Sequence, residues 1–150
     1  MIELKDENGF KVCIESVKSD YFDDYYVSKV YFYQENINLI AKLTNNKHSF
    51  IFVVCDPLSY MISHIYRAVY DNVVVCYDDH VEPDLEVYII PENFASSFNE
   101  SKYFQIMFGV DSAYFIGFDD GYIGANIFIS LDVTKESLLK FADDLEKEYQ

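Results

Sequence analysis

The sequence has no tryptophan, only five glycines and three prolines, and a single arginine among its 150 residues. Because glycine and proline punctuate turns and loops, their scarcity predicts a chain rich in regular structure. Few glycines also argue against loops that cradle phosphate groups. The sequence carries no P-loop, dinucleotide fingerprint, G-x-S-x-G elbow or C-x-x-C pair. These absences make an enzyme the less favoured expectation.

Long hydrophobic runs are also missing. No stretch approaches the roughly 18 apolar residues that a membrane-spanning helix needs. The first residues, MIELKDENGFK, lack the basic and apolar regions of a signal peptide. We therefore expect no membrane association and a cytoplasmic location.

Cysteine is sparse, with Cys13, Cys55 and Cys76 lying far apart in apolar runs. Their odd number and wide spacing do not indicate a disulfide framework. We interpret all three as small core side chains in a reducing compartment.

Hydrophobic residues make up 51% of the chain, including 14 tyrosines and 13 phenylalanines. At this length, residues 1–150 are expected to form a single domain. The sequence leaves open whether the chain forms a homodimer, because so many aromatic rings need not all fit in one core.

The local patterns predict an α+β fold with a mostly antiparallel sheet of about seven to nine strands and two main helices, at about 57–71 and 134–148. Asp56 and Pro57 are typical of a helix N-terminus, and Asn72 is a plausible stop. Thr134 is the expected cap of the second helix. The segment INLIAKL (37–43) fits a strand or a helix, with a strand favoured.

Charge is the most informative feature of the sequence. The net charge is −15 at pH 7, and residues 71–132 contain twelve acidic residues and one lysine, a local charge of −11. A coat that served only solubility would mix both signs. This distribution repels phosphate backbones and anionic membranes, which argues against nucleic-acid or membrane binding. It favours a basic protein as the partner.

Three acidic segments are candidate contacts for such a partner. Residues 70–94 carry seven carboxylates and no lysine or arginine. In the turn FDDGY, Asp119 is a carboxylate beyond the Asp120-Gly121 pair. The segment SDYFDDYYV (19–27) interleaves acidic residues with aromatic rings. Tyrosine is enriched in binding hot spots, and neighbouring acids steer a basic partner. The predicted partner-binding residues are Asp78, Asp79, Glu82, Asp84, Glu86, Asp119, Asp20, Asp23, Asp24 and Tyr25.

A metal site is the main alternative for the 78–84 segment. Asp78, His80, Glu82 and Asp84 occupy every second position, which on an extended chain places them on one face. Their spacing matches no zinc motif and lacks the glycine of a calcium loop, so a solvated acidic loop is favoured and no metal or cofactor is expected. The alternatives to a binding protein are a metal-dependent or hydrolytic enzyme centred on this cluster, and an acidic adaptor subunit.

In size, charge, composition and its closing acidic helix, the chain resembles the immunity proteins of bacterial polymorphic-toxin and contact-dependent growth inhibition systems. The resemblance is one of type and rests on no specific motif. It implies an inhibitor that neutralises a basic cognate toxin, with a nuclease as the first expectation, by covering the toxin's active site.

Overall fold

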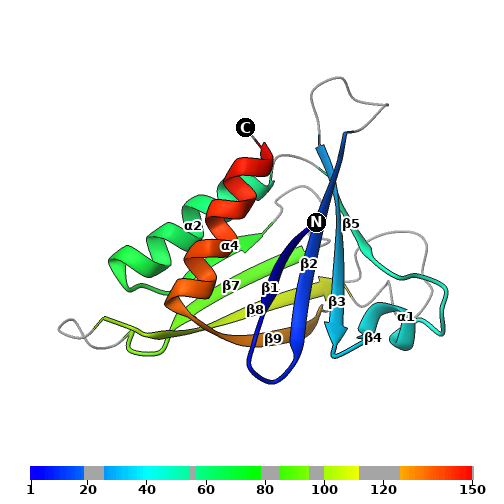
Figure 1. Ribbon diagram of the computed structural model, residues 1–150, viewed down its shortest axis with the longest axis horizontal. Coiled ribbons are helices and arrows are strands. Elements are labelled where there is room, and N and C mark those ends of the chain that lie inside the picture. Colours follow the sequence, from blue (N-terminus) through cyan, green and yellow to red (C-terminus); the bar gives the residue numbers. More distant parts are fainter. Residues whose placement is uncertain (19–25, 55–56, 79–84, 95–99, 112–125, 150) are drawn as a thin grey trace.

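The fold is α+β, as predicted, and is shown in Figure 1. This computed structural model describes residues 1–18, 26–54, 57–78, 85–94, 100–111 and 126–149. Nine strands lie in the described residues, within the predicted range, and every pairing between them is antiparallel. They form two sheets, whereas the sequence predicted one.

The first sheet contains β1 (Ile2–Lys5), β2 (Phe10–Lys18), β3 (Tyr26–Gln34) and β4 (Ile37–Asn38) in that order, with β5 (Ile51–Val54) also pairing with β3. Strand β1 was not anticipated from the sequence. A tight connection joins it to β2: the Asp6 carboxylate accepts the backbone N–H groups of Asn8 and Phe10, both at 2.8 Å. Gly9, at φ +84°, supplies a backbone conformation that other residues rarely adopt.

The second sheet contains β6 (Val75–Asp78), β7 (Leu85–Pro91), β8 (Tyr103–Asp111) and β9 (Asn126–Thr134), each paired with the next. Helix α2 (Pro57–Asp71) lies between the two groups of strands in the sequence. The strands before it pair with one another and those after it do the same, because short antiparallel connections join neighbours along the chain. This division explains why two sheets form.

Segment 37–43 differs from the prediction, because only Ile37–Asn38 is a strand (β4) and Leu39–Leu43 is helix α1. The Asn38 side chain caps the helix by accepting the backbone N–H of Ala41 at 2.9 Å. At the other end, the Thr44 hydroxyl donates to the Ile40 carbonyl at 2.7 Å. These local side-chain bonds favour one helical turn over an extended strand.

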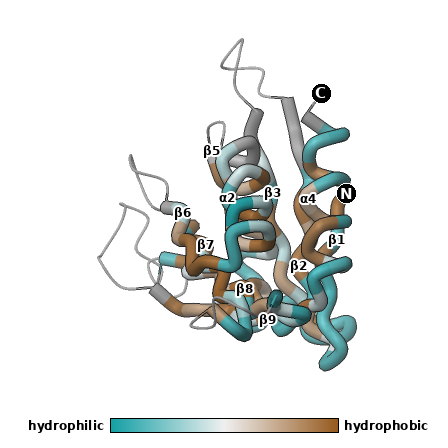
Figure 2. The backbone as a smooth tube through the Cα atoms, turned by 90° about the vertical axis from the view of Figure 1, so that its left-hand side faces the viewer, coloured by the Kyte–Doolittle hydropathy of each residue, from teal (hydrophilic) through white to brown (hydrophobic). Residues whose placement is uncertain are grey.

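The two long helices match the predicted ranges closely. The second, α4 (Lys135–Tyr149), begins after Thr134, whose hydroxyl accepts the backbone N–H of Ser137 at 3.2 Å and so acts as the predicted cap. The two helices pack together, with α2 against β6 and β7, and α4 against β1, β8 and β9 (Figure 1, Figure 2). Among the described helices, none is long and apolar enough to cross a membrane.

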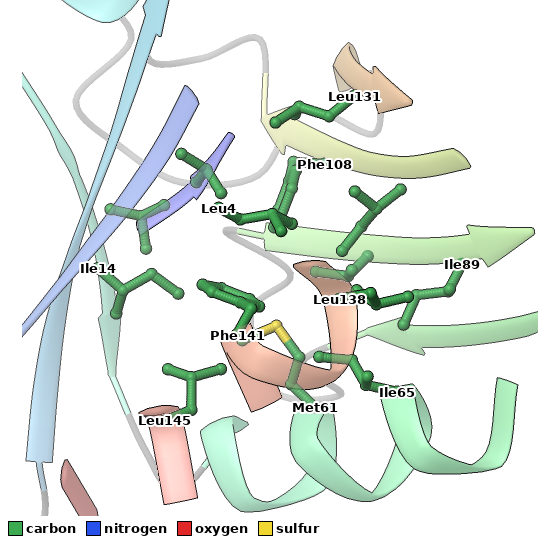
Figure 3. Close-up of a cluster of buried hydrophobic side chains, with 14 of the residues drawn as sticks. Leu4, Ile14, Met61, Ile65, Ile89, Phe108, Leu131, Leu138, Phe141 and Leu145 are labelled. Atoms are coloured by element: carbon green, nitrogen blue, oxygen red, sulfur yellow. The ribbon is translucent and has the colours of Figure 1, made fainter. Parts of the chain in front are cut away.

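One cluster of buried side chains joins both sheets and both long helices. Phe32 of β3 meets Phe108 of β8 edge to face, with ring centroids 5.5 Å apart. Figure 3 shows the labelled core side chains: Leu4, Ile14, Met61, Ile65, Ile89, Phe108, Leu131, Leu138, Phe141 and Leu145. Each sheet therefore has one face in this core.

The cysteine interpretation holds for one residue and fails for another. Cys13 is buried, and its burial, followed by the nearby Glu3 carboxylate, raises the pKa of its thiol to about 11. Cys76 is exposed, contrary to the prediction, because β6 turns this position away from the core. Cys55 lies outside the described residues.

Candidate partner-binding face of the second sheet

Charge is segregated between the two sheets. The strands of the first sheet contain four lysines and two glutamates. The strands of the second sheet contain four acidic residues (Asp78, Glu86, Asp111 and Asp132) and no lysine, arginine or histidine. The strands that follow α2 therefore form a sheet whose charged residues are all acidic.

The pairing register shows which side chains of the second sheet share a face. Strand β7 alternates strictly, with Leu85, Val87, Ile89 and Pro91 buried and the residues between them partly exposed. The paired positions form three rows across the face that points away from the core: Cys76, Tyr88, Met107 and Ser130; Glu86, Gly109 and Phe128; Ile90, Gln105 and Asp132. We call this the open face. Helices α2 and α4 pack on the opposite, core side of the sheet (Figure 1).

Aromatic rings lie near the middle of the open face. Tyr88 and Phe128 meet edge to face with centroids 5.9 Å apart, and Phe128 is 47% exposed. The Phe128 ring lies over Gly109, where an added Cβ would come within 2.6 Å of the ring. Gly109 therefore allows the ring to lie flat against the sheet.

The Tyr88 hydroxyl is held in its neutral form. Its hydrogen bond with Cys76 and, after it, the nearby Glu86 carboxylate raise the pKa of Tyr88 to about 12. Near neutral pH this side chain therefore combines an apolar ring with an O–H group. Such side chains are enriched at protein interfaces.

An open hollow of about 510 Å³ lies at one edge of this face. Its walls combine two carboxylates, those of Glu92 and Asp132, with the half-exposed rings of Phe94 and Tyr103. The other lining residues are Ile90, Pro91, Phe104 and Gln105. The hollow offers negative charge beside aromatic surface.

Asn72 positions the turn that carries Glu92 and Phe94. It ends α2 as predicted, in a left-handed conformation at φ +53°. Its side-chain amide donates to the Asn93 carbonyl at 2.9 Å, and its side-chain oxygen accepts the Ser101 N–H at 3.3 Å. The end of α2 and the wall of the hollow are therefore tied together by one side chain.

Replacing Asn72 by alanine is expected to lower the free energy of unfolding by about 2 kcal/mol, through lost hydrogen bonds and left-handed strain. Replacement by glycine should lose about 1 kcal/mol, because glycine tolerates the backbone angle. Urea unfolding of the three proteins measures both values. Equal losses for alanine and glycine would contradict the role of the backbone conformation.

Most of the predicted binding residues lie outside the described residues: Asp79, Glu82, Asp84, Asp119, Asp20, Asp23, Asp24 and Tyr25. Asp78 and Glu86 are directly paired on β6 and β7, and Glu86 belongs to the open face. The residues predicted from the sequence to bind a partner do not include Tyr88, Phe128, Glu92 or Asp132. Alternation along β7 could have identified Tyr88, but the register that brings Asp132 toward Ile90 is not visible in the sequence.

The described strand ends show where the predicted acidic segments join the fold. Segments 79–84 and 112–125 leave the same end of the second sheet, because Leu85 pairs with Val110 and Val110 pairs with Ile127. Ser28, near the start of β3, lines a small internal gap together with Tyr77 and Leu85. Segments 79–84 and 112–125 are therefore attached at the end of the second sheet opposite the hollow, and the gap places Ser28 near the same end.

The metal alternative gains no support from the described part of the chain, which contains no group of three or more histidine, cysteine, aspartate or glutamate side chains suited to hold an ion. His80, Glu82 and Asp84 of the predicted cluster lie outside it.

Comparison with known proteins adds no relative. No protein-family model matches the chain, nor does any curated protein or solved structure.

Proposed function

We propose that this chain is an acidic protein-binding inhibitor, an immunity protein that neutralises a basic cognate toxin by covering the toxin's active site. A nuclease is the first candidate, because nuclease active sites gather basic side chains to hold phosphate. An acidic surface can occupy such a site in place of nucleic acid.

The segregation of charge between the sheets is the observation that carries this proposal. Every charged residue on the strands of the second sheet is acidic, and the open face carries the exposed ring of Phe128 with that of Tyr88 against it. Aromatic anchors supply contact energy, while the surrounding acids attract a basic protein over long range. Such steering produces the fast association that an inhibitor needs to protect its own cell.

Capture followed by a rescue assay tests the proposal. The tagged chain is used to capture proteins from its native organism at low salt, with elution by rising salt and identification by mass spectrometry. The captured basic protein is then expressed in a bacterial host, alone and together with this chain. We expect growth arrest in the first case and restored growth in the second, and for a nuclease we also expect degraded DNA or RNA.

An unrelated acidic protein of similar net charge serves as the control and should not restore growth. A captured partner that is stable and harmless when expressed alone would instead support the adaptor alternative. A diffuse mixture of ribosomal proteins would mean that the charge attracts basic proteins without specificity, and the immunity proposal would fail.

A further inference from the structure

We propose that the hollow at the edge of the open face binds an arginine side chain of the basic partner. This inference deepens the proposed function and rests on it for the identity of the partner. The hollow itself can be tested without that partner.

The walls of the hollow combine the two features that a guanidinium group needs. Phe94 and Tyr103 are 56% and 48% exposed, so their rings are accessible to a planar cation. Arginine stacks on aromatic faces more readily than lysine and can form two parallel hydrogen bonds with a carboxylate. Ile90 and Pro91 provide apolar surface for the methylene stem.

The two carboxylates of the hollow are free to accept such a group. Within the described part of the chain, neither Glu92 nor Asp132 forms an ion pair or a side-chain hydrogen bond. Glu100, by contrast, forms an ion pair with Lys135, with nitrogen and oxygen 3.2 Å apart. Beside the exposed rings, the hollow therefore holds two carboxylates with which no described lysine or arginine forms an ion pair.

The strands around the hollow reinforce its preference for positive charge. On the open face, Glu86 lies two rows from the hollow, and β6 to β9 contain no basic residue. Lys102 and Lys135 flank β8 and β9 at this edge, and Lys135 is paired with Glu100. Charge complementarity therefore selects a cationic side chain, and the exposed rings favour a planar one. A neutral or anionic occupant would leave the carboxylates without compensation.

Titration of the complete chain with N-acetyl-L-arginine amide tests the site directly. Backbone amide spectra should shift at Ile90, Glu92, Phe94, Tyr103 and Asp132, with a Kd on the order of 1–10 mM for so small a ligand. The same amide of citrulline, which has nearly the same shape but no charge, should bind at least about tenfold more weakly.

Two variants separate the site from general electrostatic attraction. In Glu92→Gln/Asp132→Asn, the shape is kept and the charge removed, and we expect binding of the arginine amide to weaken at least about tenfold. The control, Glu7→Gln/Glu148→Gln, removes the same charge from two exposed positions, one in the β1–β2 turn and one near the end of α4. It should change the Kd by less than about twofold.

The outcomes distinguish this inference from the proposed function. Shifts that are absent, equal with citrulline, or unchanged in the Glu92→Gln/Asp132→Asn variant would overturn the arginine site, whatever the rescue assay shows. If the hollow binds the arginine amide but the chain rescues cells from no toxin, the arginine site stands and the immunity function is rejected.

A second copy of the chain is the competing occupant, and Arg67 is its only arginine. If the wild type sediments as a dimer and the Arg67→Ala variant as a monomer, the occupant of the hollow is a second copy of the chain. That result would overturn the assignment to a basic partner. We expect both proteins to sediment identically.

Discussion

Replacement of Phe108 by alanine is expected to lower the free energy of unfolding by about 3–5 kcal/mol. The Phe108 side chain is fully buried on β8, between Val87 of β7 and Ile129 of β9. Its ring also contacts Phe32 of the first sheet, with centroids 5.5 Å apart. Truncation would therefore leave a cavity at the place where the two sheets meet, in a domain whose total stability is on the order of 5–15 kcal/mol.

The matched control is Phe128→Ala, the same substitution on the other face of the same sheet. Phe128 is 47% exposed, and among the described residues it packs over Gly109 and against Tyr88, so we expect a loss of about 1 kcal/mol or less. Urea unfolding, followed by circular dichroism, measures both variants. Comparable losses at Phe108 and Phe128 would mean that the second sheet does not have one core face and one open face.

The largest effect on binding is expected on the open face. If the chain binds a basic toxin as proposed, Tyr88→Ala and Phe128→Ala should each raise the Kd about 30-fold, which corresponds to about 2 kcal/mol. Both rings lie near the middle of the face, and aromatic residues in the centre of an interface dominate its energy. The change should appear mainly in the dissociation rate, because these substitutions leave the acidic charge in place.

Surface plasmon resonance with the captured toxin measures these rates. The control is Tyr70→Ala, which removes an exposed tyrosine of α2, the helix layer on the other side of the second sheet. We expect its Kd to stay within about twofold of the wild-type value. A larger loss at Tyr70 than at Tyr88 would move the interface to the helices and reject the open face.

Several elements of the fold could be predicted from the sequence because their causes are local. Helix α2 has proline at its first position and an asparagine stop, and α4 has a threonine cap and an apolar stripe that the structure buries. These features act over four or five residues and depend little on the rest of the chain. The α+β class follows from these helices and from the alternating strands.

Other elements could not be predicted, because their causes are distant in sequence. Segment 37–43 becomes the short strand β4 followed by helix α1, and the local bonds that favour this helical turn are joined by a contact from further along the chain, the bond from the Asn38 amide to the Ser49 carbonyl at 2.7 Å. Cys76 and Val75 are neighbours in one apolar run, yet only Val75 faces the core. The face that a residue occupies depends on the register of its strand, which packing against α2 decides.

The candidate site likewise combines features that the sequence predicts with features that depend on the tertiary structure. The sequence by itself determined the α+β class, the two long helices and the concentration of acidic charge between residues 71 and 132, because composition and short-range periodicity carry that information. Only the tertiary structure decided that four of these acidic residues lie on the strands of a separate sheet, that Tyr88 and Phe128 share its open face, and that Glu92 and Asp132 line one hollow. Cross-strand register brings together residues 40 positions apart, and no local pattern encodes that register.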